Sequence, residues 1–218
     1  MTVTIAEELL LLAYSEDEGR QLISTMQLDP ALAGAILAEL VIAGRVELSG
    51  KKVTIKDPAP LGDDELDATL ARIAEFGKDR DASWWVQRLQ SGKLRGRLLS
   101  RLARAGVLNE EHGKVLGIFP TTRWPEAHPG VEADVRERVS AVLAGAEPDA
   151  RTGVLIAITH AAKLDRKVFP AESRARVKEI AKGDWAANAV AQTIKAMTAA
   201  GAIAAAGAAG AISTGGGS

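Results

Sequence analysis

The chain has 218 residues, a formal net charge of −1, a pI of about 6.3 and no cysteine. A chain of this length can bury well over half of the surface that its unfolded form exposes, so neither disulfides nor a metal are required to hold a core. The lack of cysteine excludes a disulfide framework, thiolate zinc sites and cysteine nucleophiles, and it fits a reducing compartment. We therefore expect a cytoplasmic protein.

Neither end of the sequence has the pattern of a targeting or membrane-spanning segment. Glu7 and Glu8 interrupt the apolar N-terminal run and no basic residue precedes them, so we expect no signal peptide. Residues 196–218 form the longest uncharged stretch, but Ala and Gly dominate it and larger apolar residues are few. Any membrane contact is therefore expected to be made from the membrane surface.

Helix-start signals recur along the chain. Thr4 and Glu7 form a capping-box pattern, and Asp29-Pro30 predicts an N-cap followed by a first-turn proline. Carboxylates at residues 63–65 favour another helix start, because they lie at the positive end of its dipole. With the spacing of apolar residues, these signals predict helices from Thr4 to near Ser15, from Asp29 to a stop at Gly44, through Leu66, Leu70 and Ile73, around Trp84 and Trp85, from about Lys93 to Ala105, and over 131–143, 154–164, 171–182 and 185–206.

One helix-end pattern occurs twice. Residues 36–44 match residues 98–106, 62 positions later, and each copy is followed by a short apolar stretch that a Gly-Lys turn interrupts. Glycine supplies the positive φ that a helix C-terminus needs, so each copy predicts a helix that ends at glycine and continues into a β-hairpin. The predicted strands are 45–48 and 52–55 in the first copy and 107–108 and 115–119 in the second, followed by a loop at 120–129.

These elements predict a mainly α fold, a single-domain helical bundle with short β-hairpins in two helix–hairpin, winged-helix-like repeats. The domain is expected to cover residues 1–212, and the Gly-rich residues 213–218 to form a flexible tail.

The sequence contains no constellation that favours catalysis, so we expect no enzymatic activity, no metal and no other cofactor. His112, His128 and His160 are scattered, without a nucleophile motif or a Gly-rich phosphate loop. His160 lies on an apolar predicted helix with no partner acid nearby, which favours a core or boundary histidine. The carboxylates at 63–67 fit no EF-hand, and a helix N-terminus accounts for them.

The most distinctive chemical feature is a basic helix face within residues 82–109, a stretch that contains no Asp or Glu. Its cations recur at helical spacing on the side opposite to the leucines, and acidic segments flank it. A concentrated basic face on a nearly neutral chain indicates an anionic partner. Its residues are Arg88, Lys93, Arg95, Arg97, Arg101 and Arg104.

Two apolar features lie beside this face. Trp84 and Trp85 are adjacent on a predicted helix, so we expect one in the core and the other at an interface. Residues 115–119 carry apolar side chains on both faces of a predicted strand, which indicates a core or a dimer contact.

A helix followed by glycine and a hairpin is also typical of winged helices, so a nucleic-acid-binding protein or a soluble scaffold is the alternative hypothesis. However, the pI is low for a duplex binder, and the helix over residues 31–43 carries a single charge, Glu39, with no side chain suited to reading bases. We therefore expect no nucleic-acid partner.

Five short segments follow one another in a specific order. They are Glu7-Glu8-Leu9-Leu10-Leu11-Leu12, Asp17-Glu18-Gly19, Glu39-Leu40-x-x-Ala43-Gly44-Arg45-Val46-x-Leu48, Pro58-Ala59-Pro60-x-Gly62-Asp63-x-x-Leu66-Asp67-x-x-Leu70 and Leu98-x-x-x-Leu102-x-x-x-Gly106-Val107-Leu108. In this order they resemble the Golgi phosphoprotein 3 family, in a shorter, bacterial, actinobacterial-type form. The resemblance implies a mostly helical domain that binds phosphatidylinositol 4-phosphate on membranes and, in eukaryotes, links Golgi glycosyltransferases to coat proteins.

The headgroup site of the eukaryotic relatives uses one Trp and three Arg. Arg95 matches one of these arginines, whereas Ser24, Ala33 and Gly92 stand where the other site residues would be. The resemblance thus implies that Arg95 binds phosphate, with Lys93 and Arg97 as substitutes for the missing residues. Arg88, Arg101 and Arg104 are expected to add a positive field, and the hairpin residues Val115, Leu116, Ile118 and Phe119 to insert into lipid or to pair with a second subunit.

The leading hypothesis from sequence is therefore a cytoplasmic, peripherally membrane-associated adaptor. Its expected partners are an anionic phospholipid surface, a protein cargo and a second copy of the chain.

Overall fold

The computed structural model describes residues 3–49, 51–115, 118–184, 191 and 194–195. Its helices are α1 (Ile5–Ala13), α2 (Thr25–Ile42), α3 (Asp64–Phe76), α4 (Ala82–Leu89), α5 (Gly92–Arg104), α6 (Pro129–Leu143), α7 (Ala150–Ala161), α8 (Asp165–Val168) and α9 (Arg174–Lys182), with a 3-10 turn, η1, at Ala171–Ser173. The strands are β1 (Val46–Ser49), β2 (Lys52–Ile55), β3 (Arg80–Asp81), β4 (Glu111–Val115) and β5 (Phe119–Arg123). The predicted mainly α, single-domain class is confirmed.

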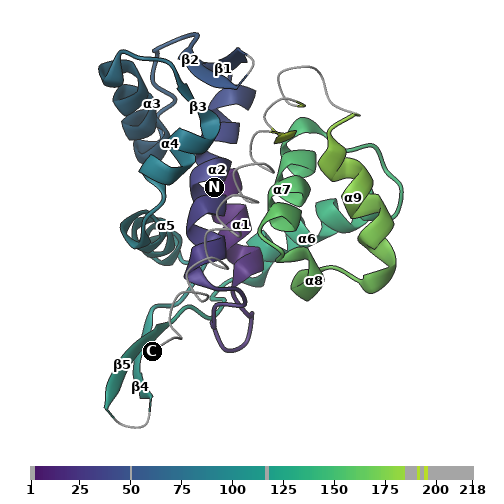
Figure 1. Ribbon diagram of the computed structural model, residues 1–218. Coiled ribbons are helices and arrows are strands. Elements are labelled where there is room, and N and C mark those ends of the chain that lie inside the picture. The colour runs from purple at the N-terminus through teal and green to yellow at the C-terminus, as the bar shows by residue number, and fades with distance from the viewer. Residues whose placement is uncertain (1–2, 50, 116–117, 185–190, 192–193, 196–218) are drawn as a thin grey trace, which may run out of the picture.

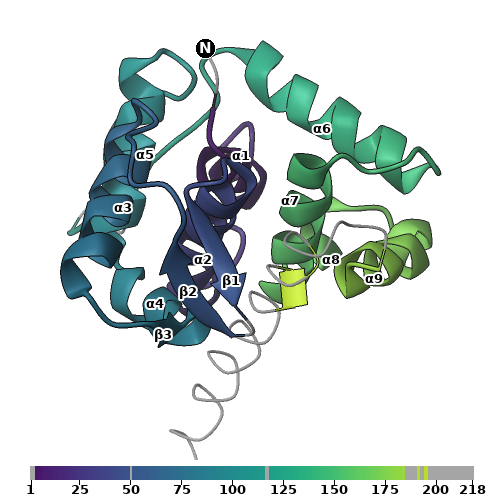
Figure 2. The ribbon, with the colours of Figure 1, turned by 90° about the horizontal axis from the view of Figure 1, so that it is seen from above.

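Helices α1 and α2 form the centre of the molecule. Helices α3, α4 and α5 and the small sheet cover one side of them, and α6 to α9 cover the other (Figures 1 and 2). Every side chain of α1 is buried, and α2 buries most of its length against α1, α4 and α7. Among the described helices only α2 has the length and hydropathy of a membrane span, but 61% of it is buried, and it is the central helix of this core.

Both predicted helix stops are confirmed, since Gly44 has a φ of +69° and Gly106 a φ of +73°. In each copy the glycine N–H donates to the carbonyl three residues earlier, and the next N–H donates to the carbonyl five residues earlier, at 2.9–3.0 Å. This is the Schellman arrangement, which satisfies the last carbonyls of a helix. The two copies therefore end their helices in the same way.

The first hairpin forms where it was predicted. Strands β1 and β2 pair antiparallel from Val46 opposite Ile55 to Ser49 opposite Lys52, and β3 adds a short third strand beside β2. Val46 and Val53 face the core, so the hairpin covers the end of α2.

The strands of the second hairpin were predicted at the wrong positions. Strands β4 and β5 pair from Glu111 opposite Arg123 to Val115 opposite Phe119, so residues 120–123 are strand rather than loop. Val107 and Leu108 are buried in the core instead of forming a hairpin strand. A strand in a two-stranded sheet has one unpaired edge, which is why β5 accommodates Pro120, a residue without an N–H.

The start of α2 also differs from its prediction. The helix begins at Thr25 after Ser24, whose backbone N–H and hydroxyl both donate to the side-chain oxygen of Gln27, at 3.3 and 2.9 Å. Pro30 therefore lies in the second turn of the helix, where its missing N–H removes one hydrogen bond. Asp29 does not cap this helix, because its carboxylate forms an ion pair with Arg95.

The loop between α1 and α2 fixes the base of the second hairpin. The N–H of Trp124 donates to the carbonyl of Gly19 at 3.0 Å, and a Cβ at Gly19 would lie 2.2 Å from the backbone N of Pro125. Only glycine allows this approach, and its φ of +59° is in the left-handed region. From this base the hairpin projects away from the helical body (Figure 1).

The remaining helix predictions are confirmed within a few residues, and a 3-10 turn precedes α9 where one continuous helix was expected. The short helix α8 was not predicted. The last predicted helix, 185–206, lies outside the described residues apart from positions 191, 194 and 195, and the predicted tail lies wholly outside them.

Candidate functional site

Helix α5 carries the basic face that the sequence singled out. The hydroxyl of Ser91 caps it by accepting the N–H of Leu94 at 3.1 Å. Leu94, Leu98 and Leu102 are buried against the core, and the basic residues occupy the other sides of the helix. The predicted amphipathic pattern of this helix is therefore confirmed.

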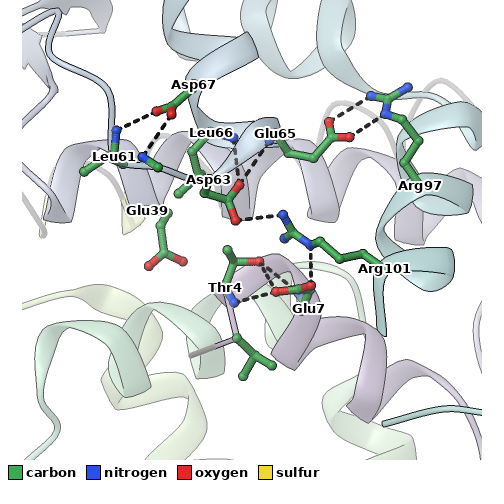
Figure 3. Close-up of polar contacts among 12 residues, drawn as sticks. Thr4, Glu7, Glu39, Leu61, Asp63, Glu65, Leu66, Asp67, Arg97 and Arg101 are labelled. Atoms are coloured by element: carbon green, nitrogen blue, oxygen red, sulfur yellow. Dashed lines mark hydrogen bonds and ion pairs between the residues drawn. The ribbon is translucent and has the colours of Figure 1, made fainter. Parts of the chain in front are cut away.

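Carboxylates from other elements neutralise much of this face. Arg101 donates to Glu7 on α1 and to Asp63, the N-cap of α3, both at 2.7 Å (Figure 3). Arg97 holds Glu65 through two parallel hydrogen bonds, of which the Nη2–Oε2 contact is 2.9 Å. These pairs fix α5 to α1 and α3.

Arg95 forms an ion pair with Asp29 of α2, and both side chains are more than four-fifths buried. Burial raises the pKa of the Asp29 carboxyl above its usual range, and the charge of Arg95 opposes this effect. Tyr14 lies close to both charges, and burial raises the pKa of its phenol to about 12. The pair connects the first turn of α5 to the second turn of α2, which places Gly92 and Arg95 near the start of α2.

The stretch that is free of acids in sequence is therefore not free of acids in space. Lys93, Arg88 and Arg104 are exposed, and none of them has an ion-pair partner among the described residues. Residues outside the described part include no Asp or Glu, so no acidic side chain is left there to neutralise them. Lys93 and Arg104 border a shallow hollow along α5 and the start of α3.

In the acidic cluster at residues 63–67, the side chains of Asp63, Glu65 and Asp67 bind groups of the protein itself. Asp63 accepts the N–H groups of Glu65 and Leu66 at 3.1 and 3.0 Å, so it is the N-cap of α3, one position before the first turn in which the sequence placed it. Asp67 accepts two backbone N–H groups of the preceding loop, and Glu65 holds Arg97 (Figure 3). Among the described residues no group of three or more His, Asp or Glu side chains is arranged to hold a metal ion.

Two large apolar side chains are strongly exposed among the described residues. Ile118 is 75% exposed near the tip of the β4–β5 hairpin, and Met26 is 57% exposed in the first turn of α2. Val115 and Phe119 form the last pair of the hairpin ladder, and Leu116 lies outside the described residues.

The prediction that one tryptophan of the pair lies in the core is confirmed. Trp85 is fully buried, whereas Trp84 is partly exposed and packs on Phe76 with ring centroids 4.8 Å apart. The guanidinium of Arg80 lies over the Trp84 ring, 5.4 Å from its centroid. Trp84 is therefore engaged in an aromatic cluster within its own chain.

Buried carboxylates on α1 and α2 tie the two sides of the molecule together. Glu8, 2% exposed, accepts from Arg138 at 2.8 Å and from Arg151 at 3.3 Å, and Arg151 also contacts Glu39. Burial raises the pKa of Glu8, and the two arginines partly offset that increase. Glu39, the single charge of the predicted helix over residues 31–43, is thus an internal ion-pair partner.

His160 has a partner acid that sequence reasoning missed. Its Nδ1 lies 2.7 Å from Oδ2 of Asp165, five residues later, because the turn after α7 folds back on the helix end. The spacing could have indicated this pair, since a helix stop between them brings such residues together.

Comparison with known families gives a match over almost the whole described chain. The family model of Golgi phosphoprotein 3 (GPP34) matches residues 5–197. This range includes α1 to α9 and both hairpins, and it agrees with the resemblance that the short sequence segments indicated.

Proposed function

Because the chain belongs to the Golgi phosphoprotein 3 family, we propose that it is a peripheral membrane adaptor that binds anionic phospholipid headgroups, phosphatidylinositol 4-phosphate among them. The observation that carries this proposal is the family match over residues 5–197. That family is not known as an enzyme family, and the proposed role needs no catalytic residue.

In this proposal Arg95 is the phosphate-binding residue, with Lys93 and Arg97 beside it. Arg95 is held in place by Asp29, and a phosphate group can replace that carboxylate because both accept two parallel donors from a guanidinium. Burial raises the pKa of Asp29, so this carboxyl takes up a proton more readily than an exposed one when a phosphate takes its place beside Arg95. Lys93 is exposed and has no acidic partner among the described residues, so it can bind a phosphate without first breaking an ion pair.

The remaining cations would supply attraction rather than specific contacts. Arg88 and Arg104 are exposed, and each Lys or Arg near an anionic membrane contributes about 1 kcal/mol. Arg101 is committed to Glu7 and Asp63, so in this proposal its role is to anchor α5. The electrostatic attraction of α5 for an anionic membrane is therefore weaker than six unpaired cations would produce, because three of the six have acidic partners.

The exposed apolar side chains support contact with lipid. Ile118 lies near the tip of a hairpin that projects from the body (Figure 1), and Met26 lies at the start of α2, the helix that carries Asp29. An apolar tip beside cations suits a surface that inserts shallowly among headgroups. The same tip could instead bind a second subunit, which sedimentation of the protein without lipid would detect as a dimer.

The test is co-sedimentation with phosphatidylcholine vesicles, with and without anionic lipid, at low and high salt. We expect binding to the anionic vesicles only, and release as salt rises, because surface charges are screened beyond about 10 Å at 0.1 M ionic strength. Equal sedimentation with neutral and anionic vesicles would contradict the proposal.

A pair of matched variants separates a defined phosphate site from a diffuse basic surface. Arg95→Lys keeps the charge but removes the two-donor geometry, so it should weaken binding, whereas Arg104→Lys should have little effect. Circular dichroism would check that both variants fold. If Arg95→Lys binds as the parent protein does, the specific role of Arg95 is wrong.

The alternative of nucleic-acid binding is tested in the same experiment with a duplex oligonucleotide as competitor. Helix α2, the counterpart of a recognition helix in the first repeat, is packed between α1, α4 and α7, which supports the expectation that it reads no bases. A tight oligonucleotide complex at physiological salt would favour the alternative.

A further inference from the structure

A second group of cations lies on the side of the molecule opposite to α5, where α7, α8 and α9 meet (Figures 1 and 2). It borders a hollow of about 240 Å³. The residues that line this hollow are His160, Asp165, Arg166, Arg174 and Lys178.

The chain builds this hollow from a tight turn. Two residues after the end of α7, Lys163 has a φ of +60°, and the N–H of Leu164 donates back to the carbonyl of Thr159 at 3.0 Å. This turn starts α8 beside the end of α7 and so places Asp165 against His160. On the facing helix, Arg174 and Lys178 are four residues apart and therefore lie on one side of α9.

The cations of this hollow are not neutralised. Arg166, Arg174 and Lys178 are exposed and form no ion pair among the described residues. The one carboxylate in the lining, Asp165, is 8% exposed and accepts from the His160 ring. The parts of the chain outside the described residues contain no Asp or Glu that could balance these charges. With a neutral histidine the lining carries a net charge of +2, from three cations and one carboxylate.

Asp165 and His160 lie side by side in the lining of the hollow. Oδ2 of Asp165 holds Nδ1 of His160, which fixes the orientation of the ring and leaves Nε2 as its other polar atom. The second carboxylate oxygen, Oδ1, is buried and has no hydrogen-bond donor among the described residues. Because phosphate oxygens are acceptors, this oxygen offers them no hydrogen bond, and the attraction for an anion comes from the three cations of the lining.

From this charge balance we propose that the hollow binds a phosphomonoester, supplied either as a small soluble ester or as a lipid headgroup. A phosphomonoester carries about −1.5 to −2 charges at pH 7, which matches the net charge of the lining. Arg166 and Arg174 can each present two donors to phosphate oxygens, and Lys178 adds a point charge. The volume is below the range of about 300–1,000 Å³ that drug-sized ligands occupy, which favours a small ligand group.

The test uses isothermal titration calorimetry of the full chain with glycerol 3-phosphate, and with glycerol at the same concentration as a neutral control. We expect saturable binding of the phosphate ester at one site and no binding of glycerol. The double variant Arg174→Gln, Lys178→Gln should bind at least about tenfold more weakly. These side chains are exposed, so the substitutions should leave the fold intact.

A second double variant, Arg72→Gln, Lys78→Gln, removes the same number of charges from exposed positions that line neither this hollow nor the basic face of α5. It should bind glycerol 3-phosphate as the parent does. An equal loss in both double variants would show a general charge effect and would overturn the proposal.

Vesicles distinguish the two sources of the phosphate group. Phosphatidic acid presents a phosphomonoester, whereas phosphatidylglycerol presents a diester of lower charge. If the ligand is a headgroup, the Arg174→Gln, Lys178→Gln variant loses its preference for phosphatidic acid vesicles. If it is a soluble ester, glycerol 3-phosphate binds and the vesicle preference of this variant equals that of the parent. No saturable binding of glycerol 3-phosphate and no preference of the parent for phosphatidic acid together overturn the proposal.

This site is independent of the one proposed on α5. Arg95→Lys should leave binding of glycerol 3-phosphate to the hollow unchanged, because α5, the helix that carries Arg95, lies on the opposite side of the molecule (Figure 1). A failure of either proposal would therefore be seen separately from a failure of the other.

Discussion

The basic face of α5 and the hollow between α7, α8 and α9 contain the same kinds of side chain but differ in their acidic partners. On α5, Arg95, Arg97 and Arg101 each contact a carboxylate that comes from another helix or its cap. In the hollow, Arg174 and Lys178 contact none among the described residues. The difference shows that cations of the same kinds are paired within the fold in one place and are without an ion-pair partner among the described residues in the other.

The position of each helix explains this difference. Helix α5 packs against α1 and α2, so its arginines reach the carboxylates at the centre of the molecule. Helix α9 contacts α7 and η1 at the periphery, and its residues Arg174 and Lys178 are exposed. An ion pair that is partly buried is sensitive to the loss of one partner, whereas an exposed cation contributes little to stability.

The largest expected effect tests this contrast directly. Arg101→Ala would leave Glu7, 1% exposed, without its guanidinium partner, and removal of one member of a buried pair costs about 3–5 kcal/mol. Asp63 would lose the same partner. We expect a large fall in the midpoint of urea unfolding, measured by circular dichroism.

Arg174→Ala is the matched control for that measurement. Its side chain is exposed and forms no ion pair among the described residues, so the unfolding free energy should change by less than about 0.5 kcal/mol. Similar losses for the two variants would mean that the pairing on α5 does not stabilise the fold.

Sequence patterns predicted the features that depend on neighbours within a few residues. The capping box at Thr4, the helix start at residues 63–65 and the glycine stops at Gly44 and Gly106 are all present, because each depends on local backbone geometry. The family resemblance was likewise correct, since it rested on several such local patterns in order.

Features that depend on distant parts of the chain were not predicted. The partners of the α5 arginines come from residues 32 to 94 positions away, so the acid-free stretch gave no sign of them. The second hairpin was misplaced because Val107 and Leu108 fit a strand as well as a core segment, and burial decides between the two. The start of α2 was missed because Asp29-Pro30 and Ser24 are both acceptable starts, and Asp29 is used by Arg95.

In a third region the carboxylates outnumber the cations, and this excess of acid leads to the next largest expected effect. Glu132 is buried on α6, and Arg136 is shared between it and Glu16 at 2.8 and 2.9 Å. Burial raises the pKa of Glu132 to about 7, and Glu16 and Glu126 contribute to the increase while Arg136 opposes it. Here carboxylates outnumber the cation that they share.

The pH dependence of stability follows from this shift. The folded state binds a proton at Glu132 more tightly than the unfolded state does, so its contribution is present below about pH 4.5 and is lost as the pH rises through about 7. Glu132→Gln removes this dependence. Relative to the parent, the variant should gain up to about 3 kcal/mol of unfolding free energy between pH 5 and 8.

Urea unfolding of both proteins at several pH values measures this difference, and the contributions of all other groups cancel to first order in the comparison. Glu126, whose pKa is also raised by burial and by Glu16, is present in both proteins. A constant difference between parent and variant from pH 5 to 8 would show that Glu132 does not titrate in this range.

The smallest expected effect comes from removing the acidic partner of an α5 arginine, so that this arginine is left without an ion pair, as the cations of the hollow are among the described residues. Asp29→Asn removes the negative partner of Arg95 and keeps the shape of the side chain, so the guanidinium becomes available to phosphate. One additional effective charge near an anionic surface is worth about 1 kcal/mol, and binding to anionic vesicles should strengthen roughly fivefold. The matched control is Glu65→Gln, which frees Arg97 in the same way, although this arginine is more exposed and lies in an ion pair at the surface.

If α5 acts only through its total charge, the two variants will strengthen binding to anionic vesicles equally. If Arg95 is the phosphate-binding residue, Asp29→Asn will have the larger effect, and this gain will disappear when Arg95→Lys is added. No gain from Asp29→Asn would show that Arg95 serves to join α5 to α2 and does not meet the membrane.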